Sequence, residues 1–144
     1  MTSTLHKTAL DFLARREHSQ QELSQKLKRH TDDAQEIERV LNLLTEQKLQ
    51  SDIRFAESFI RHRVKQGYGW QKIRAELQQR GVSDADYLQA LGKLDIQWQS
   101  VAEAAYAKRY GDTPVQDYQD KQKRMAFLQR RGFGFDEIYA ILPR

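Results

Sequence analysis

The sequence contains no cysteine and only 2 prolines and 7 glycines in 144 residues. Without cysteine the chain forms neither a disulfide framework nor a thiolate metal site, so a reducing compartment is expected. The scarcity of proline permits long uninterrupted helices. No apolar run approaches the length of a membrane span, and Met1–Ala14 lacks a basic segment followed by an apolar one. We therefore expect a cytoplasmic protein without membrane association.

Charged residues make up 31% of the chain and the mean hydropathy is -0.83, which is lean for a globular core. Such a composition is typical of a surface-rich helical protein, because a thin helical array buries less surface per residue than a sphere. The net charge of +4 comes from residues 51–144, since the first fifty residues balance. This charge permits binding to a polyanion or to an acidic protein groove without requiring either.

Helical periodicity dominates the first third of the chain. One apolar stripe, followed by a break, contains Leu5, Ala9, Phe12, Leu13 and Arg16. Ser19–Glu22 then reads as a capping box that opens a second helix bearing Leu23 and Leu27. Asp32-Asp33 opens a third helix, with Ile37, Val40, Leu41 and Leu44 on its apolar face.

The same order of elements returns twice. Ser51-Asp52 begins a helix with Ala56, Phe59 and Ile60 toward the core, and Gly67–Trp70 interrupts it before Ile73 and Leu77. Gly81 suits a helix C-terminus that needs a positive φ, and Ser83-Asp84 caps a helix bearing Tyr87, Leu88, Leu91 and Leu94. Further helices are expected over about 98–110 and 117–131, and Ile138 and Leu142 form the last apolar pair.

The spacing of these elements indicates internal repeats. Phe12-Leu13 precedes Leu23 and Leu27 by the interval at which Phe127-Leu128 precedes Ile138 and Leu142, and the Gly67–Trp70 breaker mirrors 132–135. The expected fold is therefore all-α, with nine helices in three tandem three-helix repeats at 1–50, 51–95 and 96–144. Because one such trio buries its apolar face poorly, we expect the repeats to stack into an elongated, curved body.

Several motifs resemble those of the RecX family. In the first repeat they are Leu13-x-Arg15-Arg16-Glu17-His18-Ser19-x-x-Glu22-Leu23-x-x-Lys26-Leu27, and in the second Asp52-x-x-Phe55-Ala56-x-x-Phe59-Ile60. Gly67-Tyr68-Gly69, Ile73-x-x-Glu76-Leu77 and Gly81 continue the match, and Lys123 with Phe127-Leu128-x-x-Arg131-Gly132-Phe133 ends it. The order and spacing of these motifs are more specific than any one of them, and the resemblance covers nearly the whole chain.

The resemblance implies three tandem three-helix repeats that bind a RecA–single-stranded DNA filament across neighbouring RecA subunits. It further implies modulation, mostly inhibition, of RecA ATP hydrolysis, strand exchange and coprotease activity in recombination and the SOS response. A monomer with weak, non-specific binding to single- or double-stranded DNA is expected.

Nine cations are candidates for contact with RecA or DNA. They are Arg15, Arg16, Arg54, Arg61, Lys65, Lys72, Arg74, Arg130 and Arg131. Positions 54, 61 and 65 project together from one helix, either as an ordinary solvated face or as a cationic stripe that the next helix widens. The dibasic pairs at 15–16 and 130–131 end their helices, where they neutralise terminal carbonyls or present guanidinium forks to carboxylates and phosphates.

The aromatic residues beside the glycines, Tyr68, Trp70, Phe133 and Phe135, are interpreted as wedges between repeats, with base stacking as the alternative. The four histidines have no metal-ligand spacing, and no carboxylate pair lies in an apolar setting. No enzymatic activity, metal or cofactor is therefore expected. The rival hypothesis is a stand-alone helical DNA-binding module, because helix pairs recur in every repeat. Mixed charges in the 71–76 segment argue against it.

Overall fold

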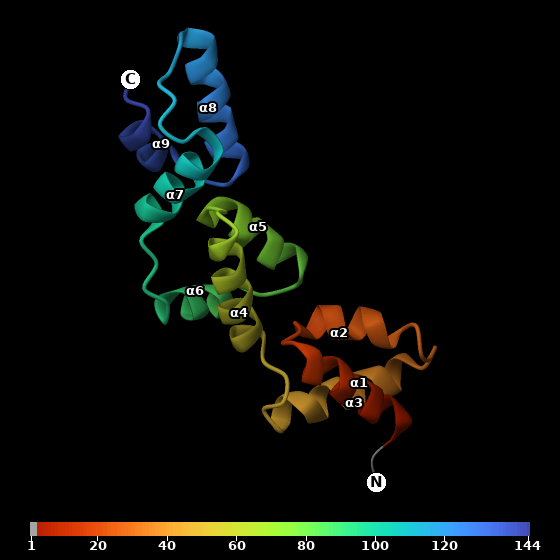
Figure 1. The fold of residues 1–144 in the computed structure, drawn as a ribbon. Helices are drawn as coiled ribbons and strands as arrows, with labels where there is room; N and C mark the ends of the chain where they lie inside the picture. The colour runs from red at the N-terminus through yellow and green to blue at the C-terminus, as the bar shows by residue number, and fades with distance from the viewer. Residues whose placement is uncertain (1–2) are drawn as a thin grey trace. The chain divides into compact units, whose positions relative to one another are not determined.

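Residues 3–144, which the computed structural model describes, form nine helices and no strand (Figure 1). The first trio contains α1 Thr4–Arg15, α2 Gln20–Leu27 and α3 Ala34–Glu46. The second contains α4 Asp52–Lys65, α5 Trp70–Gln79 and α6 Asp84–Gly92, and the third α7 Trp98–Tyr110, α8 Tyr118–Arg130 and α9 Phe135–Ile141. The predicted all-α class is confirmed. No helix in this described span is long and apolar enough to cross a bilayer.

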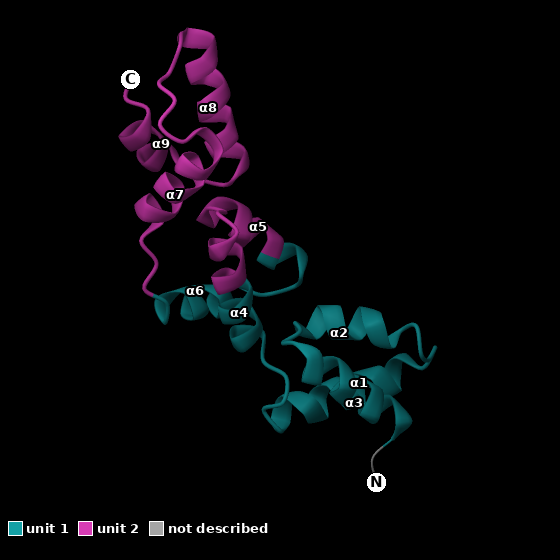
Figure 2. Ribbon diagram, in the orientation of Figure 1, with its two compact units in different colours: residues 1–59, 77–94 teal, residues 60–76, 95–144 magenta. Residues whose placement is uncertain are grey.

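The chain divides into two compact units, coloured separately in Figure 2. Unit 1 contains the residues up to Phe59 together with Leu77–Leu94, and unit 2 contains Ile60–Glu76 and Asp95–Arg144. The middle trio contributes to both units, because α4 and α5 each have residues in the two of them.

Short polar side chains begin the helices of unit 1 as the sequence predicts. The Ser19 hydroxyl accepts a hydrogen bond from the Glu22 N–H at 3.1 Å, and the Glu22 carboxylate accepts one from the Ser19 N–H at 3.1 Å. The Asp33 carboxylate caps α3 by accepting from the N–H groups of Gln35 and Glu36, and the Ser83 hydroxyl caps α6 by accepting from the Asp86 N–H. Gly81, with φ +81°, follows the end of α5 in the left-handed conformation that a side chain would strain.

One hydrophobic core of unit 1 is formed by the apolar stripes of the first trio. Its buried members are Leu5, Ala9, Leu23, Leu27, Ile37, Val40, Leu41 and Leu44. Three predictions about apolar stripes are wrong in detail. Arg16 is exposed, because α1 ends before it, and Leu88 on α6 is 56% exposed. Phe59 is only half-buried, and the neighbouring Phe55 is the ring that is buried.

One hydrophobic core of unit 2 is built by α7, α8 and α9, which pack against one another pairwise. Its buried members are Ala102, Ala105, Leu128, Phe133, Ile138 and Leu142. Phe133 is 1% exposed, and a Cβ at Gly69 of the second trio would lie 2.7 Å from its ring, which agrees with the predicted wedge between repeats. The wedge interpretation is wrong for Phe135, which is 54% exposed and stacks on the Tyr139 ring at 5.7 Å.

A buried arginine binds the loop between α7 and α8 to the helices of unit 2. Arg124 on α8 donates to the Tyr106 hydroxyl at 2.7 Å and to the Thr113 carbonyl at 2.8 Å, and it pairs with Asp120 at 3.1 Å. Its guanidinium also lies 4.5 Å from the centroid of the Tyr110 ring. These bonds hold the pKa of Arg124 above its ordinary value, chiefly through the Tyr106 hydroxyl, so the buried side chain remains charged.

Candidate partner-binding surface

The glycine-rich breaker of the second trio brings two distant segments into backbone contact within unit 2. The N–H of Gly69 donates to the Arg131 carbonyl at 2.7 Å, and the N–H of Gln71 donates to the Gly132 carbonyl at 3.1 Å. A Cβ at Gly69 would lie 2.5 Å from the Gly132 carbonyl carbon, so both positions need glycine. This contact places Tyr68 beside the end of α8.

Tyr68 is surrounded by three cations of unit 2. The charged groups of Arg63, Lys72 and Arg131 lie 5.6, 5.3 and 4.8 Å from the centroid of its ring. Arg63 also pairs with Glu76 at 2.9 Å. Cations over a tyrosine face are attracted by the negative face of the ring, so Tyr68 gathers positive charge at this surface.

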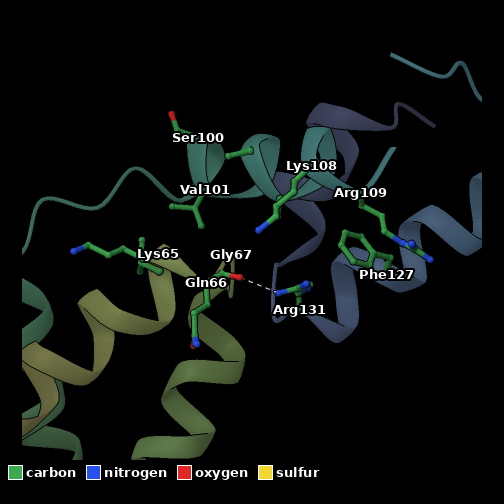
Figure 3. Close-up of a pocket in the computed structure, with 12 residues that line it drawn as sticks. Lys65, Gln66, Gly67, Ser100, Val101, Lys108, Arg109, Phe127 and Arg131 are labelled. Atoms are coloured by element: carbon green, nitrogen blue, oxygen red, sulfur yellow. Dashed lines mark hydrogen bonds between the residues drawn. The ribbon is translucent and has the colours of Figure 1, made fainter. Parts of the chain in front are cut away.

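Next to Tyr68 lies a cavity of about 520 Å³, shown in Figure 3. It lies among the end of α4, α7 and the end of α8. Apolar side chains of Val64, Val101, Ala104, Ala105 and Phe127 line it. Lys65, Lys108, Arg109 and Arg131 line it as well. We call this cavity, with these four cations, the basic cavity.

One hydrogen bond and two ring contacts orient Arg131 at the edge of the basic cavity. Its Nη1 donates to the Gln66 carbonyl at 3.0 Å, drawn as a dashed line in Figure 3. Its guanidinium also lies 5.3 Å from the centroid of the Phe127 ring and 4.8 Å from that of Tyr68. A guanidinium placed between two rings loses little further freedom when it binds a ligand, because its orientation is already set.

The positive charge of the basic cavity has no carboxylate partner in residues 3–144: Lys65, Lys108, Arg109 and Arg131 make no ion pair there. Lys108 and Arg109 lie in the last turn of α7, where the helix dipole stabilises cations. The same described residues hold no cluster of histidine and carboxylate groups suited to a metal ion. The cavity can therefore attract an anionic group.

The structure does not gather the nine predicted cations into one site. Lys65 and Arg131 line the basic cavity, and Lys72 joins Arg131 at Tyr68. Arg61, Arg74 and Arg130 are exposed elsewhere in unit 2. In unit 1, Arg15 is exposed, Arg16 pairs with Glu22 at 3.1 Å, and Arg54 pairs with Glu17 at 3.4 Å.

Sequence reasoning missed Lys108 and Arg109, which supply half of the cations of the basic cavity. A signal was present, because this dibasic pair ends its helix as the pairs at 15–16 and 130–131 do. Helix ends alone do not distinguish a cation that faces a cavity from one that faces only water.

Arg16 belongs to a polar cluster around His18, which is 1% exposed. The Nδ1 of His18 donates to the Arg16 carbonyl at 3.0 Å, and its Nε2 accepts from Lys26 Nζ at 2.7 Å, which requires the neutral ring. Burial lowers the pKa of His18 below 6.5, the bond to Arg16 opposes this, and the nearby charges of Arg16 and Lys26 lower it further. Burial raises the pKa of Glu22, but the Arg16 guanidinium and the Ser19 N–H outweigh it and lower the pKa below its usual value.

The stability of the protein should therefore decrease in acid through His18. Because the folded pKa is lower than the unfolded value of 6.5, the unfolded chain binds the proton first. The contribution of His18 to the free energy of unfolding is complete above about pH 6.5. Below that pH the free energy of unfolding decreases by at most about 1.4 kcal/mol per pH unit, because one proton is bound. Urea unfolding between pH 5 and 8 measures this. His18→Gln should flatten the profile between pH 5 and 6.5, whereas the exposed His30→Gln should not; equal profiles for both variants would refute the assignment.

The three trios match three models of known domains. Residues 7–44 match the first three-helix domain of RecX, residues 51–91 the second and residues 95–142 the third. The regulatory protein RecX of Pseudomonas fluorescens is 41% identical over 139 residues, and the match covers 96% of this chain and 89% of that protein. That of Halorhodospira halophila is 39% identical, covering 96% and 86%. The crystal structure of RecX from Lactobacillus salivarius matches with a TM-score of 0.76 at 23% identity, covering 98% and 94%.

Fold and surface together define a tandem three-helix-repeat protein with a basic cavity among its helices. The chain belongs to the RecX family. The resemblance drawn from the sequence motifs is thus confirmed at the level of the family, as is the division of the fold into three three-helix domains.

Proposed function

We propose that this protein is a non-enzymatic regulator that binds RecA filaments on single-stranded DNA and slows their ATP hydrolysis. Membership of a family whose curated members are named regulatory proteins supports this role. Inhibition of strand exchange and coprotease activity, and action as a monomer in the cytoplasm, belong to the same proposal. Boundaries between the repeats at residues 50/51 and 95/96 are also part of this proposal.

The observation that most supports a filament-binding surface is the uncompensated charge of unit 2. The four cations of the basic cavity, with Lys72 at Tyr68, make no ion pair to a carboxylate anywhere in the described chain. A recombinase filament on DNA presents acidic side chains and phosphates, to which such a surface is complementary. A ligand that prefers one filament state slows turnover, because ATP hydrolysis requires the filament to leave that state.

The direct test is RecA's DNA-dependent ATP hydrolysis, measured with this protein from substoichiometric to equimolar amounts. We expect hydrolysis to fall as the protein is added, and the protein to sediment with filaments assembled on single-stranded DNA. Unchanged hydrolysis at every ratio, with no co-sedimentation, would refute the proposal.

Binding to DNA alone should be weak, independent of sequence and strongly reduced by salt, because it rests on cations and phosphates. Titration of labelled single- and double-stranded oligonucleotides at two salt concentrations measures this. Tight binding to one duplex sequence at physiological salt would instead favour a stand-alone DNA-binding module.

Arg61→Glu with Lys65→Glu should weaken inhibition of RecA about tenfold, or ~1.4 kcal/mol, without unfolding the protein. Both residues are exposed in unit 2, Lys65 lines the basic cavity, and exposed substitutions usually change stability little. The concentration for half-inhibition and a circular dichroism melt are the two measurements.

The matched control is Lys28→Glu with Arg29→Glu, which makes the same change in charge at two exposed positions of unit 1. It should leave inhibition near that of the parent protein. Equal loss in both double variants would mean that net charge, and not the surface of unit 2, determines binding.

A further inference from the structure

We propose that the basic cavity receives a short acidic segment of the partner protein, which inserts one apolar side chain among α4, α7 and α8 and places carboxylates against the surrounding cations. That the partner is RecA rests on the proposed function. The chemistry of the segment follows from the cavity itself.

The lining of the cavity calls for an apolar group. Val64, Val101, Ala104 and Ala105 meet there, and the short alanine side chains leave room that larger residues would fill. Gly67, with φ +85°, lets the chain after α4 approach α7 so closely that a Cβ would lie 3.4 Å from that of Ala105. A volume of about 520 Å³ is within the range of sites that enclose a ligand group. An apolar side chain placed here leaves water, which is favourable.

The cations around this lining call for carboxylates. Lys108 extends into the space between Val101 and Arg131 (Figure 3). Lys65 and Arg109 lie on opposite sides of this space. Arg131 has five N–H donors, and within the described residues one hydrogen bond, to the Gln66 carbonyl, uses them. Charge-assisted bonds from guanidinium and ammonium groups to carboxylates are about twice as strong as neutral ones.

A protein segment fits this cavity better than an unpaired DNA base does. Bases bind proteins by stacking on flat aromatic or guanidinium faces. Phe127, the aromatic residue that lines the cavity, already contacts Arg131 at 5.3 Å and the Tyr110 ring edge-to-face at 5.6 Å. Arg131 in turn contacts Tyr68 and Phe127. The Phe127 ring and the Arg131 guanidinium, on which a base could stack, thus already contact other side chains, whereas the aliphatic lining is available to a ligand.

The first experiment uses no RecA. Because the chain lacks cysteine, Ser100→Cys gives a single attachment point for an environment-sensitive dye at the edge of the cavity. The probes are a peptide of repeating Glu-Glu-Leu and an oligothymidine of similar charge. We expect a saturable emission change with the peptide, and its loss when Ala104→Trp fills the cavity. A response to the oligothymidine alone, or to neither probe, would overturn the proposal.

The second experiment measures co-sedimentation with RecA filaments on single-stranded DNA. Ala104→Trp should weaken binding at least about tenfold, whereas Ala107→Trp, exposed on the same helix but outside the cavity lining, should stay within about twofold. Equal binding by both variants and the parent would overturn the cavity proposal and leave the filament-binding function standing. Peptide binding by a parent protein that does not sediment with filaments would refute that function and leave the cavity proposal standing.

Discussion

Gly132→Ala is expected to destabilise unit 2 by about 2–5 kcal/mol. The residue has φ +99°, and a Cβ there would lie 2.6 Å from the backbone nitrogen of Lys72. A left-handed alanine costs about 1–2 kcal/mol, and crowding in a close-packed region costs about 1–3 more. The relief of that clash would separate Gly132 from Gln71, whose N–H donates to the Gly132 carbonyl at 3.1 Å.

Gly111→Ala separates the two contributions. Gly111 has φ +59° and no atom within 4 Å of an added Cβ, so it retains the backbone strain without the clash. Because its ψ is -135°, a side chain there adopts a sparsely populated backbone conformation, and the cost should be about 1–3 kcal/mol. Urea unfolding followed by circular dichroism compares the two variants with the parent. If Gly132→Ala proved no more costly than Gly111→Ala, the close approach of the two segments would be refuted.

The contact between these two glycine-rich breaks could be predicted from the sequence only in part. The likeness of Gly67–Trp70 to residues 132–135 was visible in the sequence, and it correctly predicted two helix breaks. That the first break contacts the second was not predictable, because a glycine needed for positive φ and one needed for close contact look the same in sequence. Gly69 is of the second kind, since its need arises from the Gly132 backbone at 2.5 Å.

The cation site was predicted in part for a similar reason. Arg54, Arg61 and Lys65 lie on one helix as predicted, but Arg54 pairs with Glu17 in unit 1, whereas Lys65 lines the cavity in unit 2. Whether a surface arginine meets a carboxylate depends on a residue far along the chain. Periodicity within one helix contains no information on that partner.

Local rules succeeded where the cause is local. The capping box at Ser19 and the positive φ of Gly81 each depend on a few neighbouring residues, and both are confirmed. The packing of the helices within the third trio required the structure. Spacing predicts its three helices but does not show that α7 packs on both α8 and α9.

Leu23→Ala should cost about 2–5 kcal/mol, because Leu23 is fully buried in the core shared by α1, α2 and α3. It begins the apolar pair of α2, and its removal leaves a cavity that close-packed neighbours fill only in part. The measurements are the urea midpoint and the thermal melt of the full chain.

Leu88→Ala is the matched control, since it deletes the same atoms from a leucine that is 56% exposed. Surface substitutions usually change stability by less than about 0.5 kcal/mol, so this variant should melt close to the parent. A large loss of stability in Leu88→Ala beside a small loss in Leu23→Ala would contradict the assignment of Leu23 as buried and Leu88 as exposed. The expected ranking would show that α2 depends on this core, because eight residues are too few for a helix to persist in water without tertiary contacts.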